Sequence, residues 1–76
     1  MGAKTLTLYV VGLRLTDGMV QPLAWTKGRL SKKQLRRVGR NFRRAVDVVE
    51  PVSMHWARLY RSPSEAMKEL PHYDAH

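Results

Sequence analysis

The chain has 76 residues, with fourteen Lys and Arg against six Asp and Glu, a formal net charge of +8, and no cysteine. A chain of this length holds one small domain, so we expect residues 1–76 to form either a marginally stable monomer or a homodimer that hides extra apolar surface. The absence of cysteine excludes disulfide bonds and thiolate metal sites. No run approaches the roughly 18 apolar residues of a membrane span, and we expect a cytoplasmic protein.

The first predicted element is a strand over residues 4–16, where apolar and polar residues alternate. The apolar positions change parity after Gly12, so one regular strand cannot place all of them on a single face. We therefore expect either a β-bulge near Val11 and Gly12 or a strand that is buried on both faces.

A hairpin and a second strand follow. Asp17-Gly18 is a dipeptide typical of tight hairpin turns because glycine tolerates a positive φ. The second strand is predicted from about Met19 to Thr26. It contains Pro22, which has no N–H to donate to a neighbouring strand, so this strand should lie at an edge of the sheet.

A long amphipathic helix is predicted between Ser31 and Pro51. Ser31 and Gln34 form a Ser-x-x-Gln capping box, and Pro51 ends the helix because residues before a proline avoid helical conformation. The helix would be about 28 Å long. Gly39 in its interior indicates either a close approach to a strand or a ligand, or a glycine that the helix simply tolerates. Its apolar positions recur with helical spacing at Leu35, Val38, Phe42, Ala45, Val46 and Val49.

Two shorter elements complete the prediction. His55–Arg61 has the composition and alternation of a third strand. Ser62 begins a second capping box with Pro63 at the first helical position, which predicts a short helix over about 65–70. Residues 72–76 are expected to form a frayed tail.

The element order predicts a small α+β fold, β-β-α-β-α, with a three-stranded sheet in the order 2-1-3. The strand-helix-strand unit favours a right-handed crossover and parallel pairing. The long helix would pack its apolar side on one face of the sheet, and the short C-terminal helix would follow the third strand.

The long helix also carries the main candidate site. Its seven basic residues would fill an arc of about 140° opposite the apolar face. No acid occurs between Asp17 and Asp47, and cations near the start of a helix oppose its dipole, so this cluster works against folding and indicates binding. Lys27 and Arg29 extend it in the preceding loop. The seven residues on the helix are Lys32, Lys33, Arg36, Arg37, Arg40, Arg43 and Arg44.

Two functions fit this surface. The first is a module without enzymatic activity that binds nucleic acid, DNA or RNA, through phosphate contacts. The second is a small inhibitor or adaptor, of the kind a phage or mobile element encodes, that docks on an acidic or nucleic-acid-binding surface of a host protein. Membrane binding is not expected, because the apolar face of the helix is needed to cover the sheet.

Other chemistry has little support in the sequence. Trp56 and Tyr60 are candidates for stacking on bases if they face away from the long helix. His55 is a remote candidate for the general base of a small nuclease, but no carboxylate is paired with it by spacing. His72 and His76 are four residues apart, as in a helical ligand pair, but they lie in the predicted tail, and no cysteine or nearby acid completes a ligand set. We therefore expect no metal site and no cofactor.

Overall fold

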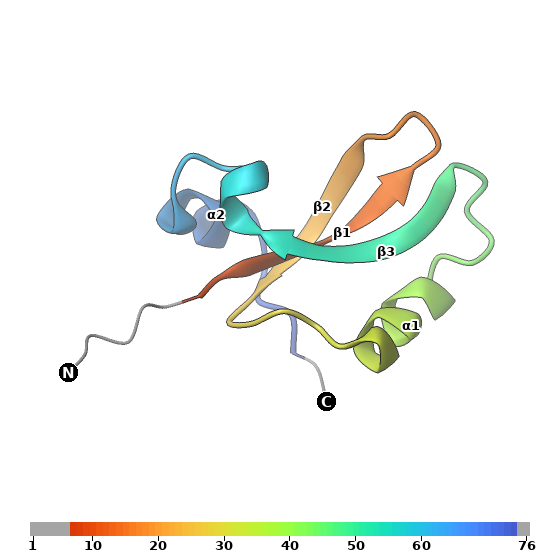
Figure 1. Ribbon diagram of the computed structural model, residues 1–76, viewed down its shortest axis with the longest axis horizontal. Coiled ribbons are helices and arrows are strands. Elements are labelled where there is room, and N and C mark those ends of the chain that lie inside the picture. The colour runs from red at the N-terminus through yellow and green to blue at the C-terminus, as the bar shows by residue number, and fades with distance from the viewer. Residues whose placement is uncertain (1–6, 75–76) are drawn as a thin grey trace.

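The computed structural model describes residues 7–74 and has three strands and three helical segments (Figure 1). The sheet has the order β2-β1-β3, which confirms the predicted order and the α+β class. Both neighbours of β1 are antiparallel to it, so β2 and β3 run in the same direction but never pair, and the expected parallel pairing is wrong. The elements are β1 (Tyr9–Leu15), β2 (Val20–Thr26), α1 (Lys32–Arg40), β3 (Val48–His55), the 3-10 helix η1 (Trp56–Arg58) and α2 (Pro63–Glu69).

The central strand β1 is buried on both faces, which was one of the two expectations for this segment. Successive side chains of a strand point to opposite faces. Val11 and Leu13 belong to one buried cluster, with Leu30 and Val38, while Val10 belongs to a second cluster. The change of parity in the sequence therefore reflects two cores, one on each side of the same strand.

The irregularity expected near Val11 and Gly12 is also present. Val11 pairs with Ala24 and Gly12 pairs with Pro22, so one residue of β2, Leu23, has no partner on β1. The extra residue thus belongs to β2 rather than to β1. β2 lies at an edge of the sheet, as the proline predicted.

The hairpin between β1 and β2 is confirmed. Gly18 has a φ of +88°, a left-handed conformation that side chains rarely adopt. The Met19 N–H donates to Asp17 Oδ1 at 2.9 Å, and the Gly18 N–H donates to the Leu15 carbonyl. Asp17 and Gly18 therefore form the turn that their sequence predicted.

α1 packs on one face of the sheet and begins as predicted. The Ser31 hydroxyl accepts from the Gln34 N–H at 3.2 Å, and the Gln34 side chain accepts from the Ser31 N–H at 2.8 Å. Val38 is buried, and Leu35 and Phe42 pack on the same cluster, as the helical spacing indicated.

The predicted length of this helix is wrong, because α1 ends at Arg40 after nine residues. Residues 41–44 continue in tighter turns, in which the Phe42 N–H donates to the Gly39 carbonyl at 3.0 Å. Gly39 and Asn41 are weak helix formers. A longer helix would also place Arg43 and Arg44 beside Arg40 at the spacings where like charges repel.

The segment after α1 forms the third strand instead of the rest of a helix. β3 contains Pro51, so this proline lies within an edge strand rather than at the end of a helix. Val46 is 91% exposed and Val49 is 59% exposed, and Ala45 is also exposed, so their helical spacing does not mark a buried face. The valines of β3 are β-branched, and β-branched residues favour strands. Pairing with β3 also gives hydrogen-bond partners to the backbone groups on the second edge of β1.

The third strand predicted at His55–Arg61 is therefore wrong as well. Residues 56–58 form η1, and the Leu59 and Tyr60 N–H groups donate to the Trp56 carbonyl at 3.0 and 2.9 Å. The tight turn places Trp56 and Tyr60 on the second buried cluster. Trp, Leu and Tyr are common in strands, but here packing determines the conformation.

α2 covers the second face of the sheet. Its N-cap is Ser62, whose hydroxyl accepts from the Glu65 N–H at 3.2 Å, and Pro63 occupies the first position. Ala66 is fully buried against Leu8 and Val10. Figure 1 shows α1 and α2 on separate parts of the sheet, and the two clusters place them on opposite faces.

The end of the described chain pairs with β2. The Trp25 N–H donates to the Pro71 carbonyl, and the Tyr73 N–H donates to the Trp25 carbonyl at 2.9 Å. Part of the expected tail is therefore tied to the sheet, whereas residues 75 and 76, and residues 4–6 of the first predicted strand, lie outside the described residues. No helix within residues 7–74 has the length and apolar character needed to cross a membrane.

Replacing Gly39 and Gly12 with alanine should change the free energy of unfolding in opposite directions. A Cβ at Gly39 would lie 3.4 Å from Pro51 Cγ, an ordinary contact, so Gly39→Ala should raise the free energy of unfolding by about 0.5–1 kcal/mol through better helix propensity. A Cβ at Gly12 would lie 2.7 Å from the Gln21 carbonyl oxygen, so Gly12→Ala should lower it by more than about 1 kcal/mol. Urea unfolding of both variants measures the difference, and equal effects would contradict the packing described.

Candidate functional site

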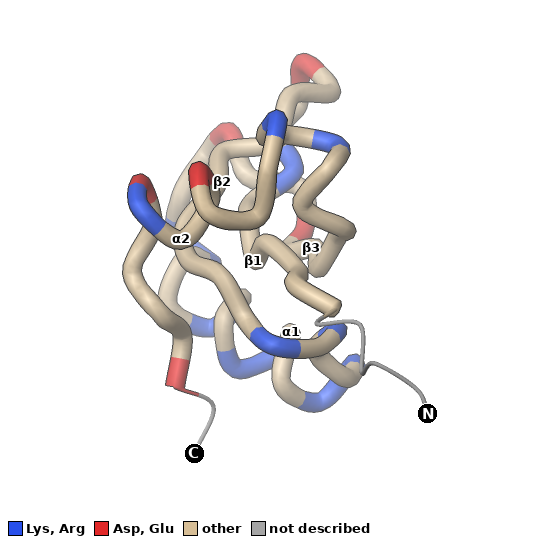
Figure 2. Tube along the Cα trace, turned by 90° about the vertical axis from the view of Figure 1, so that its left-hand side faces the viewer, with Lys and Arg blue, Asp and Glu red and all other residues tan. Residues whose placement is uncertain are grey.

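Nine basic residues on three successive segments form the candidate site, which we call the basic surface. Two lie in the loop after β2, five on α1, and two in the turns that follow α1. Figure 2 shows the Lys and Arg positions gathered along α1 and its neighbouring turns. The members of the basic surface are Lys27, Arg29, Lys32, Lys33, Arg36, Arg37, Arg40, Arg43 and Arg44.

Every member of the basic surface is exposed. Apart from Arg37, none of these side chains makes a hydrogen bond or an ion pair with another residue in the range 7–74. The acid Glu50 is instead engaged by Arg14, whose Nε lies 3.1 Å from Glu50 Oε2. Most of these charges therefore meet solvent, and they are available to a ligand of opposite sign.

The early end of α1 changes the dipole argument made from the sequence. The first turn of α1 has no acidic residue, and Lys32 and Lys33 begin the helix, so these two cations oppose the helix dipole as expected. Arg37 and Arg40 lie in the last turn, where the dipole favours cations. Only the start of α1 is therefore electrostatically costly.

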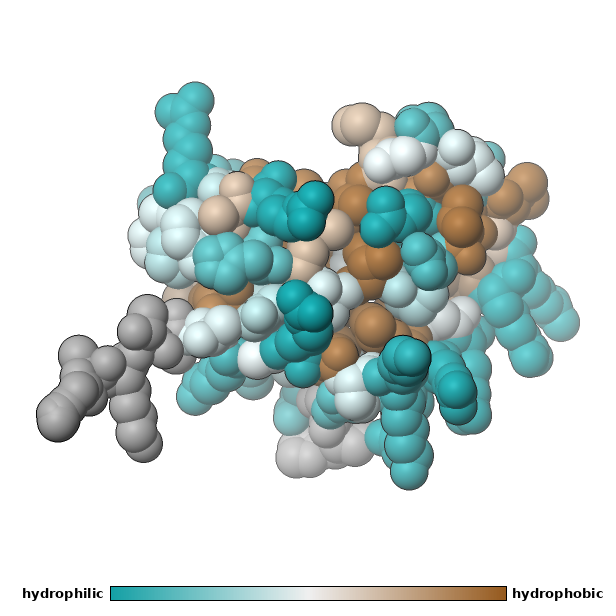
Figure 3. All heavy atoms as spheres, viewed as in Figure 1, coloured by the Kyte–Doolittle hydropathy of each residue, from teal (hydrophilic) through white to brown (hydrophobic). Residues whose placement is uncertain are grey.

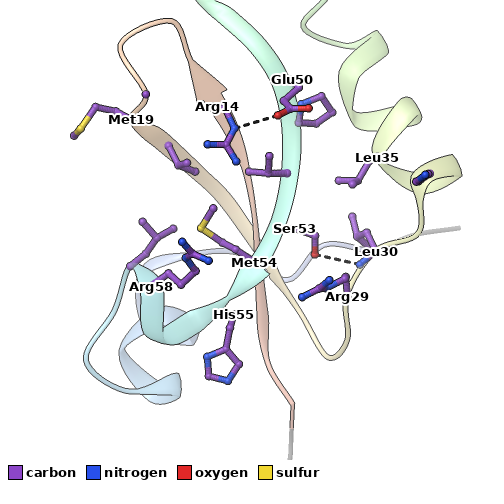
Figure 4. Close-up of a pocket in the computed structure, with 16 residues that line it drawn as sticks. Arg14, Met19, Arg29, Leu30, Leu35, Glu50, Ser53, Met54, His55 and Arg58 are labelled. Atoms are coloured by element: carbon purple, nitrogen blue, oxygen red, sulfur yellow. Dashed lines mark hydrogen bonds and ion pairs between the residues drawn. The ribbon is translucent and has the colours of Figure 1, made fainter.

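The loop that carries Lys27 and Arg29 is held at both ends. The buried Thr26 hydroxyl donates to the Gly28 carbonyl, and the N–H of buried Leu30 donates to Ser53 Oγ at 3.1 Å. Figure 4 shows this bond between Leu30 and β3. The two basic side chains thus project from a fixed backbone.

The turns after α1 are fixed by one apolar side chain. Phe42 packs on the first cluster, and the Ala45 N–H donates to its carbonyl at 2.9 Å. Arg43 and Arg44 follow this anchor and are exposed. The basic surface therefore continues beyond the helix, although not on the single helix that the sequence predicted.

The two aromatic candidates lie away from the basic surface. Trp56 and Tyr60 are half-buried against the second cluster, on the face of the sheet opposite α1. Burial raises the pKa of the Tyr60 phenol above its ordinary value of 10.0, and the charges of Glu69 and Glu65 and a hydrogen bond with Glu69 raise it further. Two carboxylates beside Tyr60 make this position unfavourable for a phosphate.

An open groove that the sequence did not indicate runs along β3 (Figure 4). It combines apolar side chains with basic ones, and Figure 3 shows apolar surface between hydrophilic side chains over this part of the sheet. No sequence signal for it was available, because its residues come from the hairpin, the loop after β2, α1, β3 and η1. Among its lining residues are Arg14, Met19, Val52, Met54, Arg58 and Leu59.

Within residues 7–74, no three His, Asp or Glu side chains lie close enough together to hold a metal ion. The ring of His55 has aromatic neighbours instead: Tyr9 lies edge-on at 6.0 Å and Trp56 lies tilted at 5.2 Å between ring centroids. Comparisons with protein-family models, with curated proteins and with solved structures gave no match.

The raised pKa of Tyr60 gives a prediction for stability at alkaline pH. The folded protein holds the phenol proton more tightly than the unfolded chain, so this contribution is fully present below about pH 10 and is lost as the pH rises through the folded-state pKa. Tyr60→Phe should therefore lose less stability than the parent chain between about pH 9 and pH 11. Urea unfolding at both pH values measures this, and equal losses would contradict it.

Proposed function

We propose that the protein is a binding module without enzymatic activity that engages a polyanion, nucleic acid, through the basic surface. The observation that carries the proposal is the exposure of all nine basic side chains, from Lys27 to Arg44. A solvated protein surface normally mixes charges of both signs, and this one does not. Six of the nine basic residues are arginines, whose planar guanidinium suits phosphate oxygens.

The supports beneath these side chains favour the same function. The loop and α1 are anchored by the buried side chains of Leu30 and Val38, and the following turns by the partly buried Phe42, which packs on the same cluster. Cations held on a fixed backbone lose less freedom on binding than cations on a disordered tail. Their spread over three segments also suits a row of successive phosphates better than one small anion.

The dependence of affinity on salt tests the proposal. If six phosphates are contacted, log affinity should fall against log salt with a slope of about −5 on duplex and about −4 on a single strand. Removing two contacts in the double variant Arg36→Gln and Arg43→Gln should reduce the slope by about 1.4–1.8 and the affinity roughly 25-fold to 60-fold near 0.1 M salt. Fluorescence anisotropy with labelled oligonucleotides provides the measurement.

The control removes the same amount of charge elsewhere. Arg61 and Lys68 are exposed and lie outside the basic surface, so Arg61→Gln with Lys68→Gln also lowers the net charge by two. This control should keep the parent slope within experimental error. Equal losses in the two double variants, or no binding at low salt, would contradict a defined surface.

The groove along β3 favours a second candidate function, docking on an acidic protein. Met19 is 64% exposed and Leu59 is 37% exposed, and both line the groove with Arg58; Arg14 also lines it but is paired there with Glu50. Apolar side chains edged by basic ones fit a partner surface with an apolar centre and an acidic rim. A stoichiometric complex that forms after nuclease treatment and is lost in Leu59→Glu, in a chain without oligonucleotide affinity, would favour this function over the first.

A further inference from the structure

Three flat side chains from three segments meet at the end of the sheet next to the start of α1. Tyr9 of β1 is paired directly with His55 of β3, so both side chains lie on the same face of the sheet. The guanidinium carbon of Arg29, from the loop after β2, lies 5.2 Å from the centroid of the Tyr9 ring. We call this group the stacking surface.

The rings of the stacking surface are held in place. His55 Nδ1 accepts a hydrogen bond from the Ala57 N–H at 3.2 Å, and the neighbouring Trp56 ring is tilted by 35° from the imidazole. The backbone on both sides of Arg29 is held by the Thr26 bond to Gly28 and the Leu30 bond to Ser53, and the Arg29 guanidinium lies over the Tyr9 ring. Flat groups that are ordered before binding lose little freedom when a ligand stacks on them.

The stacking surface is also open and continuous with the basic surface. His55 and Arg29 are exposed and Tyr9 is half-buried. Figure 4 shows Arg29 and His55 at the same end of β3. Tyr9 has the same parity in β1 as Val11 and Leu13, which contact the α1 side of the sheet, so the stacking surface lies on the face that α1 partly covers. Arg29 belongs to both surfaces and joins them.

We propose that the stacking surface receives an unpaired base, so that the ligand class of the module is single-stranded nucleic acid. This inference rests on the proposed function, because the basic surface must hold the phosphates of the same strand. Bases inside a duplex are already stacked and paired, whereas bases of a single strand are free to stack on aromatic rings and guanidinium planes. Exposed histidine and arginine planes beside a row of cations match that requirement, and both DNA and RNA strands meet it.

Two substitutions remove the flat groups and keep what surrounds them. Arg29→Lys retains the positive charge without the planar guanidinium, and His55→Asn retains a side-chain acceptor for the Ala57 N–H without the ring. The matched control is Arg61→Lys, at an exposed arginine that belongs to neither surface and does not line the groove. Circular dichroism and thermal unfolding establish that each variant is folded.

The probes are a single-stranded DNA and a single-stranded RNA of about 12 nucleotides and a DNA duplex of equal length. The double variant Arg29→Lys and His55→Asn should bind both single strands about 5-fold to 150-fold more weakly than the parent, with an unchanged salt slope and a duplex affinity within about twofold. The ring protons of His55 should shift upfield in NMR spectra when the single strand is added and not when the duplex is added.

The outcomes separate the inference from the proposed function. Unchanged single-strand affinity in the double variant, with a loss in Arg36→Gln and Arg43→Gln, overturns the stacking surface and leaves the basic surface standing. An equal loss on duplex and single strands also overturns it, since stacking then has no part in the discrimination. Absence of oligonucleotide binding by the parent chain at low salt overturns both.

Discussion

The burial of β1 on both faces is the constraint on which the rest of this structure depends. A chain of 76 residues has few apolar side chains, and β1 divides them between two clusters that contact opposite helices. Each helix covers its part of the sheet with a few side chains, such as Leu35, Val38 and Ala66. Because the apolar side chains of α1 face the sheet, the basic residues of α1 and of its neighbouring segments lie on the outer, solvent-exposed side. Fold and charge distribution are thus parts of one arrangement.

Local sequence patterns predicted the structure correctly where a residue type is compatible with only one backbone arrangement. The Asp17-Gly18 turn, the Ser31 cap and the edge position of the Pro22 strand all follow from backbone geometry or from a missing donor, and all are confirmed. These three features needed no knowledge of distant contacts. The sheet order was predicted from the hairpin and a parallel third strand over residues 55–61; the order is confirmed, but the third strand is β3, which is antiparallel to β1.

The segment 41–61 could not be predicted in the same way. Positions 42, 45, 46 and 49 have helical spacing, yet only Phe42 is packed, because the free edge of β1 takes the following residues as a strand. Pro51 ends a helix and is tolerated at a sheet edge, so it was compatible with both interpretations. The composition of residues 56–60 favours a strand, but burial on the second cluster bends this segment into a tight turn. In each case a contact distant in sequence outweighs the local pattern.

The candidate site was predictable as a set of residues and not as a shape. The nine basic positions were evident from the sequence, and they are all exposed. Their distribution over a loop, a short helix and a turn was not evident, nor was the meeting of Tyr9, Arg29 and His55, which depends on strand pairing and on one hydrogen bond to Ser53. Basic residues distributed over a loop, a short helix and a turn would follow a curved nucleic-acid backbone, the proposed ligand, more readily than basic residues on one straight helix.

The two prolines of the sheet have a further consequence for copies that bind side by side. Both outer strands, β2 and β3, contain one proline each, Pro22 and Pro51, and a proline cannot supply a donor to an incoming strand. If the protein binds a long polyanion as proposed, many molecules would lie close together, and exposed strand edges promote aggregation under that condition. A proline in each outer strand, together with the pairing of the chain end on β2 at Trp25, would then hinder edge-to-edge pairing between neighbouring copies.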